Sequence, residues 1–544
     1  MQDIFKQPES LNAIIEKCNG GLLCLMPPIE DMRRELRYHG KRLMVNRLTH
    51  SARFINELMV SLSDVTKLSK AARCFVNSHI DSSKSFTEVW REEDGPGIDE
   101  LQMARSLYDS RELKRCAHVL KSAEGKPDCQ ASLFLYNYAL YMHGSQRREE
   151  EIFEKNKSKQ YAGIKVNDSS IVNQQAKNLV RQMERLYQQD QLDDLNTYLY
   201  GMMMSDLLRY DDSANAFIKC LNINPCHWGA WQELARLILQ DKLTSRESYE
   251  LLSKIKDHWM KNFFLASLLL EKVKLIEQFD SCCLDILSAL LSFYNKSSYL
   301  TSQVAQLFYH KKDHDTSILV FQEMLRKDPY RLDNLDIYSN ILYVKDNPKD
   351  LGALAYNCFN VNKYSAETNC IIGNYHSLMS DHEKAIIYFR QALTLDRTFL
   401  AAWTLIGHEY LELKKVANAI DAYNHAVKID NKDFRAWYGL GQAYELQSLL
   451  PTAIHYYLMA VKTRPRDFRM WNALSVVYSK IDKPEEAAKC SERSENYKDD
   501  ERIALFNLAK IYDSLGLTEK AVACFIENLN RIDSTPTFES VESK

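Results

Sequence analysis

The chain has 544 residues, of which 45% are hydrophobic and 26% are charged, so it can form several domains or one long array with a substantial core. Glycine (16 residues) and proline (12) are scarce, which disfavours a β-rich or loop-rich protein and favours long runs of helix. The formal net charge of −3 includes no strong basic block, and no apolar run approaches the ~20 residues that span a bilayer, so no nucleic acid and no membrane is predicted as a partner.

Residues 1–95 are predicted to form an N-terminal helical region, with apolar helices that do not follow the repeat found further along the chain. The chain begins without a secretory signal, and its 13 cysteines are odd in number and scattered. We therefore expect reduced thiols, and a protein of the nucleus and cytoplasm.

The stretch GSQRREEEIFEKNKSKQ (144–160) is charged and shows no apolar period. It predicts a solvated insertion at residues 144–170, disordered as such composition often is. A contact point for a charged partner is the alternative. Residues 171–297 follow, with one block of repeat-like residues near 194–227 and less regular helices after it.

Residues 298–532 carry a regular 34-residue repeat. Trp403, Trp437 and Trp471 are each separated by 34 residues. Counting from Leu400 as position 1, the repeat has Trp at position 4, Gly at 8, Tyr at 11 and 24, and Ala at 20 and 27. The phase continues in both directions, although the frame is degenerate over 332–365. This is the tetratricopeptide (TPR) pattern, in which each repeat is a helix-turn-helix.

The spacing has a packing reason. Small residues at positions 8 and 20 let the two helices of a repeat approach closely, and aromatic residues at 4, 11 and 24 fill the space between repeats. One repeat cannot bury its own apolar face, so repeats stack into a right-handed superhelix. The predicted fold class is therefore all-α, a TPR solenoid whose first helices line a concave groove.

Polar side chains recur at position 9 of the first helices, where they are expected to face this groove. Amide groups both donate to and accept from a peptide backbone, and neighbouring carboxylates can pair with basic side chains of a ligand. The bland alternative is that these residues are only solvated. The predicted peptide-binding residues are Asn340, Glu367, Asn374, His408, Glu412, Gln442 and Glu445.

Several reactive-looking residues fail as active sites. His408 lies in HEYLE, which lacks the second histidine of a zinc helix because Glu412 stands in its place. Cys220, Cys226 and His227 lie close in sequence but lack a fourth metal ligand nearby. No phosphate-binding or nucleophile motif occurs. No catalytic residue, no cofactor and no metal site is therefore predicted, and the protein is not expected to be an enzyme.

The chain ends in a predicted flexible tail, residues 533–544, with the sequence DSTPTFESVESK from Asp533. Thr535 precedes a proline, so it is a candidate site for a proline-directed kinase. A phosphate there would add charge to a loose segment without disturbing a packed core.

The array resembles the TPR subunits of the anaphase-promoting complex (cyclosome), a ubiquitin ligase, and within them the eighth-subunit family (cell division cycle protein twenty-three). The resemblance covers roughly residues 97–532, and it makes residues 96–143 early TPR-like helices. The segments that carry it are CAHVLK (116–121), LFLYNYALYMHG (133–144), CHWGAW (226–231), KDPYR (327–331), IGNYHSL (372–378), AWTLIGHEYLELK (402–414) and RAWYGLGQAYE (435–445).

The resemblance implies a non-catalytic scaffold that promotes mitotic progression. Members of the family form homodimers through their N-terminal repeats and stack with other TPR subunits. Their grooves receive extended peptides from small accessory subunits and from the N-terminal motif of coactivators. The ligase chemistry lies on other subunits.

Two further functions stay open from the sequence. A TPR co-chaperone or adaptor would bind peptide tails, but its carboxylate clamp needs basic groove residues, and position 5 carries none. An enzyme with an attached TPR region would need a catalytic domain, for which the repeats leave little room.

Overall fold

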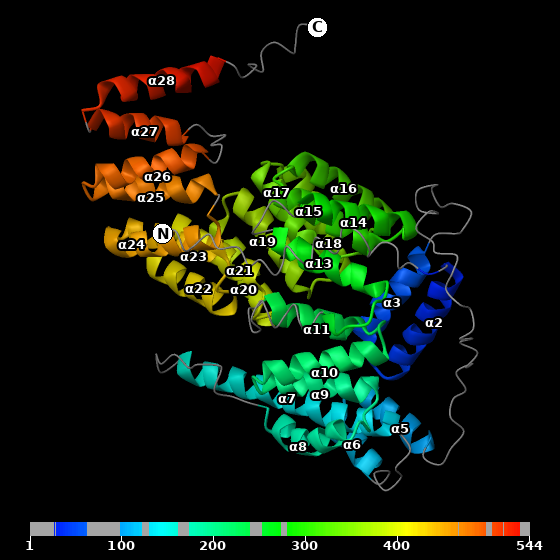
Figure 1. The fold of residues 1–544 in the computed structure, drawn as a ribbon. Helices are drawn as coiled ribbons and strands as arrows, with labels where there is room; N and C mark the ends of the chain where they lie inside the picture. The colour runs from blue at the N-terminus through cyan, green and yellow to red at the C-terminus, as the bar shows by residue number, and fades with distance from the viewer. Residues whose placement is uncertain are drawn as a thin grey trace. The chain divides into compact units, whose positions relative to one another are not determined.

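The computed structural model describes residues 27, 29–62, 98–121, 130–160, 173–239, 253–273, 280–465, 467–496, 503–514 and 516–533 (Figure 1). Within these ranges every regular element is an α-helix and none is a strand, which confirms the predicted all-α fold. The chain divides into two compact units, and the division falls between Lys311 and Lys312. None of the described helices is both long and apolar enough to cross a membrane.

The N-terminal unit (residues 6–311) is built from helical hairpins around one large apolar core. Trp231, Trp259 and Phe217 are among its fully buried side chains. Its described helices are α2 (Ile29–Val45), α3 (Thr49–Ser61), α5 (Ile98–Asp109), α6 (Leu113–Lys121), α7 (Gln130–Gln160), α8 (Gln174–Gln188), α9 (Asp194–Asp206), α10 (Tyr210–Ile223), α11 (Trp228–Leu239), α13 (Met260–Val273), α14 (Asp280–Phe293) and α15 (Ser298–His310).

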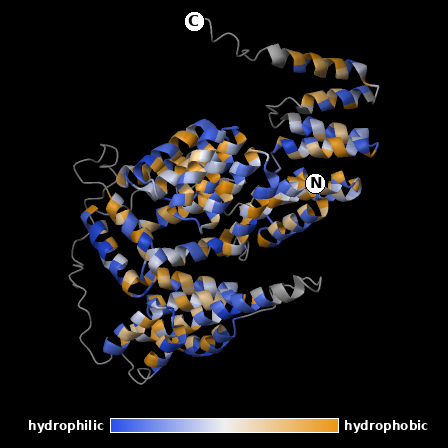
Figure 2. Ribbon diagram, turned by 180° about the vertical axis from the view of Figure 1, so that it is seen from behind, coloured by the Kyte–Doolittle hydropathy of each residue, from blue (hydrophilic) through white to orange (hydrophobic). Residues whose placement is uncertain are grey.

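The C-terminal unit (from Lys312) is a stack of helix pairs, and Figure 2 shows that its helices carry both hydrophobic and hydrophilic residues. Its described helices are α16 (His314–Lys327), α17 (Leu335–Val344), α18 (Pro348–Val361), α19 (Ala366–Leu378), α20 (His382–Leu395), α21 (Leu400–Glu412), α22 (Val416–Ile429), α23 (Phe434–Leu446), α24 (Leu450–Thr463), α25 (Phe468–Lys480), α26 (Pro484–Asn496), α27 (Ile503–Ser514) and α28 (Thr518–Asp533).

Glycine at position 8 receives the aromatic ring of position 24 from the same repeat. A Cβ added at Gly407 would lie 2.4 Å from the Tyr423 ring, and one added at Gly373 would lie 2.4 Å from the Phe389 ring. Both rings are fully buried. The close helix approach predicted from the small residues is therefore confirmed, and its purpose is to seat this ring.

The position 4 tryptophans close the turn between one repeat and the next. The indole Nε1 of Trp403 donates to the backbone carbonyl of Arg397 at 3.0 Å, six residues earlier, and Trp437 and Trp471 make the same bond. Trp231 repeats it on Pro225 at 2.8 Å in the N-terminal unit. The tryptophan therefore fixes the geometry of the turn as well as filling space.

Position 15 takes the left-handed backbone conformation in every repeat of the C-terminal unit, although only the last one has glycine there. This residue ends the first helix, and hydrogen bonds from it and its successor return to that helix, as in Ser448 to Glu445 and Leu449 to Tyr444. The position 15 residues with positive φ are Lys312, Asp346, Ser380, Lys414, Ser448, Asp482 and Gly516, with Leu208 in the block from 194.

The same turn also occurs where the 34-residue frame is absent or degenerate. Arg47 joins α2 to α3 with φ 64°, and Arg111 joins α5 to α6 with φ 60°. The degenerate frame at 332–365 likewise forms the pair α17 and α18 around Asp346. Helical hairpins with this left-handed turn residue therefore already occur in the N-terminal unit, well before the regular array that starts at residue 298.

Two boundary predictions differ from the structure. Residues 144–160, predicted as a disordered insertion, continue α7 to Gln160. Gln, Arg, Glu and Lys are strong helix formers, so this charged stretch needs no apolar period to be helical. The unit division lies at 311/312 and not at 297/298, between the two helices predicted as one repeat. The candidate phosphosite Thr535 lies outside the described residues.

Candidate peptide-binding surface

The first helices of four successive repeats, α17, α19, α21 and α23, lie side by side and form a surface that we call the first-helix wall. Each second helix packs against its own first helix and against the first helix of the next repeat. The wall carries all seven residues predicted to bind a peptide, and the structure places them in three different roles.

Asn374 is structural in this chain. Its side chain is only 2% exposed, and its amide donates to Ser339 Oγ and to Asn340 Oδ1, both at 2.8 Å. The two asparagines therefore form the predicted row across neighbouring repeats, but they bond to each other. Asn340 is partly exposed whereas Asn374 is buried, so Asn340 is the better candidate of the two for a ligand.

An acidic pair lies beside this row. Asp336 on α17 and Glu367 on α19 are both partly exposed. Burial raises the pKa of Asp336, and the nearby charge of Glu367 raises it further, while Arg435 on α23 acts in the opposite direction. The wall therefore holds a concentration of negative charge that a basic ligand group would relieve. Asp336 holds position 5 of α17 and was not among the predicted site residues.

His408 is half-buried on α21 and contacts its own repeat. Its Nδ1 lies 2.9 Å from the hydroxyl of Tyr423, the residue whose ring packs against Gly407, so the imidazole is a hydrogen-bond partner of that hydroxyl. Burial lowers the pKa of His408 to about 4, and the charge of Arg435 adds to this effect. The imidazole is therefore neutral at pH 7, and it can offer a hydrogen bond to a ligand but no charge.

The remaining predicted residues differ in how free they are. Glu445 accepts from Tyr457 Oη at 2.8 Å and from Lys480 Nζ at 2.6 Å, so its charge is already partnered. Gln442 is partly exposed, and Glu412 is exposed at the end of α21. Asn340, Glu367, Gln442 and Glu412 are therefore accessible members of the predicted set.

Glu409 lies next to His408 on α21 and was not among the predicted site residues. It is only 4% exposed, and it accepts from Ser377 Oγ at 2.7 Å and from His382 Nδ1 at 2.8 Å. Ser377 in turn lies 3.3 Å from the hydroxyl of Tyr343. This chain of contacts links α17, α19 and α21.

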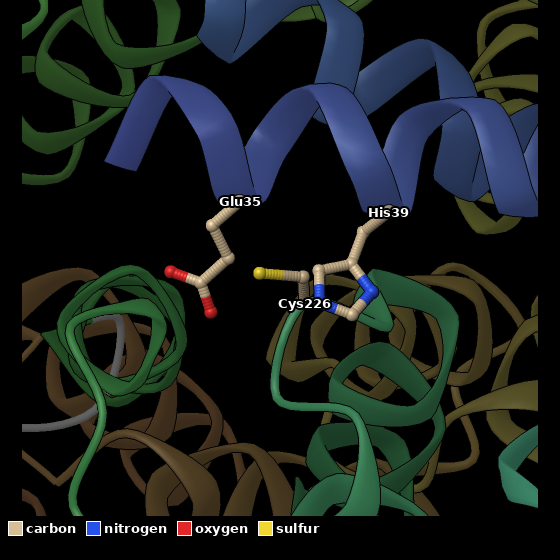
Figure 3. A group of neighbouring side chains, drawn as sticks. All are labelled: Glu35, His39 and Cys226. Carbon is tan, nitrogen blue, oxygen red and sulfur yellow. The ribbon is translucent and has the colours of Figure 1, made fainter. Parts of the chain in front are cut away.

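A second polar cluster lies inside the N-terminal unit, where Glu35 and His39 of α2 point toward Cys226, just before α11 (Figure 3). One ligand atom from each lies within 4.8 Å of the others, which is the kind of set that can hold a metal ion. Both carboxylate oxygens of Glu35, however, already accept hydrogen bonds, from His258 Nε2 at 2.8 Å and Trp259 Nε1 at 3.0 Å.

Glu35 therefore joins α2 to His258 and Trp259, just before α13, whereas the buried Nδ1 of His39 has no hydrogen-bond partner among the described residues. Burial works to raise the pKa of Glu35, but its hydrogen bond and charge interaction with His258 hold that pKa below its usual value. Burial also lowers the pKa of His39 to about 4. At pH 7 Glu35 is therefore a carboxylate and His39 a neutral imidazole in this interior.

Comparison with known proteins places the chain in a family. The family model described as anaphase promoting complex subunit 8 / Cdc23 matches residues 31–305, so the similarity starts well before the residue 97 expected from the sequence. Models of TPR repeats match residues 366–399, 407–448 and 504–527.

The same relationship appears in whole proteins. Anaphase-promoting complex subunit 8 of Arabidopsis thaliana is 43% identical over 454 residues, which cover 83% of this chain and 75% of the relative. The protein of that name from Dictyostelium discoideum is 39% identical over 472 residues, covering 79% of this chain and 77% of the relative.

A solved structure agrees on the fold. The crystal structure of the APC/C hetero-tetramer Cut9–Hcn1 aligns with a TM-score of 0.52 and 18% identity, covering 80% of this chain and 87% of that chain. At this identity the likeness shows the TPR fold alone. The family model and the two relatives go further, and they show that this chain belongs to the anaphase promoting complex subunit 8 / Cdc23 family.

Proposed function

We propose that the chain is a non-catalytic scaffold subunit of the anaphase-promoting complex, which organises other subunits and binds extended peptides on its first-helix wall. Family membership supports the place in the complex. The proposed peptides are the N-terminal motif of a coactivator and segments of small accessory subunits, and the outcome of binding is mitotic progression. The proposed sites of action are the nucleus and cytoplasm.

The observation that carries the peptide-binding part is the acidic pair Asp336 and Glu367 close to the partly exposed amide of Asn340, with the partly exposed amide of Gln442 two repeats further along the same wall. Amide groups can hold a peptide backbone of any sequence. A ligand arginine would pair with the two carboxylates through a charge-assisted, often bidentate hydrogen bond. The wall therefore favours an extended peptide with a basic side chain.

The test is binding of a synthetic coactivator N-terminal peptide to the full chain, with Glu367→Gln combined with Gln442→Ala. We expect affinity to fall about tenfold or more, equivalent to about 1.4 kcal/mol, because one charged and one amide contact are lost. The matched control is Glu383→Gln, at an exposed site on the second helix α20, which should bind like the unmodified chain.

Circular dichroism and thermal melting should be unchanged in both variants, because the substituted side chains are not in the core. A folded double variant that binds the peptide normally would remove the first-helix wall as the site. Binding of an acidic peptide through its free C-terminal carboxylate, with no binding of the basic one, would instead favour the co-chaperone or adaptor alternative.

A further inference from the structure

The last described helix, α28, keeps an apolar face open to solvent. Val522, Ile526 and Leu529 are 54%, 51% and 59% exposed. Their spacing of four and three residues puts them on one stripe of the helix. Figure 2 shows the hydrophobic residues on this terminal helix, which follows α27 at the end of the stack.

Positions 21 and 28 are each buried in two earlier repeats, whereas position 25, held by Ile526, is exposed there too, as at Tyr356 and Leu458. Position 21, held by Val522 here, is 7% exposed in both Ile386 and Ala488. Position 28, held by Leu529, is 8% exposed in both Leu393 and Val461.

The aromatic slot at position 24 shows the same contrast. Phe389 and Tyr423 are 0% exposed and Tyr457 is 1% exposed, whereas Phe525 of α28 is only partly buried. In each earlier case the cover is the first helix of the next repeat, because α20 packs on α21, α22 on α23, α24 on α25 and α26 on α27. The face of α28 thus resembles the face that earlier second helices use to bind the next repeat, but no described first helix covers it.

We propose that the α28 face, formed by Val522, Phe525, Ile526 and Leu529, docks an amphipathic helix supplied by another protein. This helix takes the place on α28 that α21 holds on α20. It continues the repeat-to-repeat interface of the array, so its apolar side covers positions 21 and 28 while its polar side faces outward.

The internal interfaces also describe the occupant. The first helices α19, α21, α23 and α25 are each 13 residues long. α23 brings Gly439 so close to the Tyr423 ring that an added Cβ would lie 2.3 Å from it. A docked helix of about this length, with glycine or alanine over Phe525, fits the face.

A second copy of this chain fits less well than a different protein. Every interface of this kind in the array joins a second helix to a first helix. Two α28 faces meeting about a twofold axis would join second helix to second helix, a pairing that the array does not use. The occupant is therefore a foreign helix that imitates a first helix.

The experiment uses the tagged full chain, recovered from its own cells in its native assembly and compared with the free chain. Amide hydrogen exchange is measured over residues 518–529, and a photo-crosslinking amino acid replaces Ile526. We expect exchange there to slow at least tenfold in the assembly. The crosslinked peptide, identified by mass spectrometry, should lie in an amphipathic helix of a different protein.

The variant Val522→Asp with Leu529→Asp, which keeps the crosslinking residue at position 526, should abolish both signals, whereas Leu446→Asp, a control at a 63% exposed site on α23, should leave them intact. All three sites are exposed in the free chain, so circular dichroism should be unchanged. Exchange as fast in the recovered sample as in the free chain would overturn the proposal. So would a crosslink to a second copy or to this chain itself.

Discussion

Glu409 shows how a single side chain can tie successive repeats together. Its carboxylate accepts hydrogen bonds from Ser377 on the first helix before it and from His382 on the second helix between them. A carboxylate that is only 4% exposed must be compensated by such bonds, because burying it alone is costly. The residue therefore matters to the stack although no ligand needs to touch it.

Glu409→Ala should lower the free energy of unfolding by about 1–3 kcal/mol, because Ser377 and His382 lose a buried partner. The matched control is Glu412→Ala, on the same helix but exposed, which should change it by less than about 0.5 kcal/mol. Urea unfolding followed by circular dichroism measures both. Equal effects of the two substitutions would contradict the structural role of Glu409.

His408 makes stability depend on pH. Burial lowers its pKa to about 4 in the folded chain, below the unfolded value of about 6.5, so the unfolded state binds the proton more readily. The stabilisation is complete above about pH 6.5 and is lost as the pH falls toward about 4. Between pH 7 and 5 this residue alone should cost up to about 2 kcal/mol.

His408→Gln should therefore reduce the loss of stability between pH 7 and 5, measured by urea unfolding of the full chain at both values. The control is His455→Gln, at an exposed site on α24. If His408→Gln loses as much stability on acidification as the unmodified chain, the imidazole is not held neutral by its burial.

At the scale of elements, the turn at position 15 explains which repeats the sequence reveals. The repeats over residues 366–463 can be recognised in the sequence, because their packing requires large residues (tryptophan) and small residues (glycine and alanine) at fixed positions. The turn residue itself gives no signal: Lys414, Ser448 and Asp482 hold a conformation that glycine usually takes. The hairpin turning at Arg47 was therefore missed as a hairpin of this kind, whereas Arg111 lies within residues 96–143, which the family resemblance predicted to be early TPR-like helices.

Lys414→Gly should stabilise the chain by up to about 1 kcal/mol, because a left-handed conformation costs a side-chain-bearing residue roughly that much. The same substitution at Lys428, exposed in the last turn of α22, should destabilise by about 0.5–1 kcal/mol, because glycine weakens a helix. Chemical denaturation should thus give shifts of opposite sign. A destabilised Lys414→Gly variant would speak against the turn geometry.

The candidate site was predictable in outline and less so in detail. The 34-residue period placed the predicted residues on adjacent first helices, as the structure has them. It could not tell that Asn374 is buried and bonded to Asn340, or that Glu445 is engaged by Tyr457 and Lys480. Such pairings depend on how far one repeat rotates on the next, and the period does not contain that rotation.

At the scale of the whole molecule, the division between Lys311 and Lys312 suggests where the chain can be cut. Each unit has its own buried core, and repeats rely mainly on their neighbours. Fragments 1–311 and 312–544 should therefore each remain helical. Following the family resemblance, we expect the proposed homodimer to form through the N-terminal unit.

Sedimentation should then show fragment 1–311 as a dimer and fragment 312–544 as a monomer at the same concentration. An obligate interface of this kind buries on the order of 2,000 Å² or more, so dissociation on modest dilution is not expected. A monomeric 1–311 fragment, or a dimeric 312–544 fragment, would contradict this placement of the homodimer.

The left-handed turn residues have one more use, as markers. Lys312, Asp346, Ser380, Lys414, Ser448 and Asp482 are exposed, one in each repeat, and the variety of these residues shows that the site accepts almost any side chain. A pair of spectroscopic labels at two of these positions would report the distance between two repeats. Distances between adjacent and between more remote repeats would give the pitch of the superhelix. A change in these distances on addition of a peptide would show that the array is elastic, and constant distances would show that it is rigid.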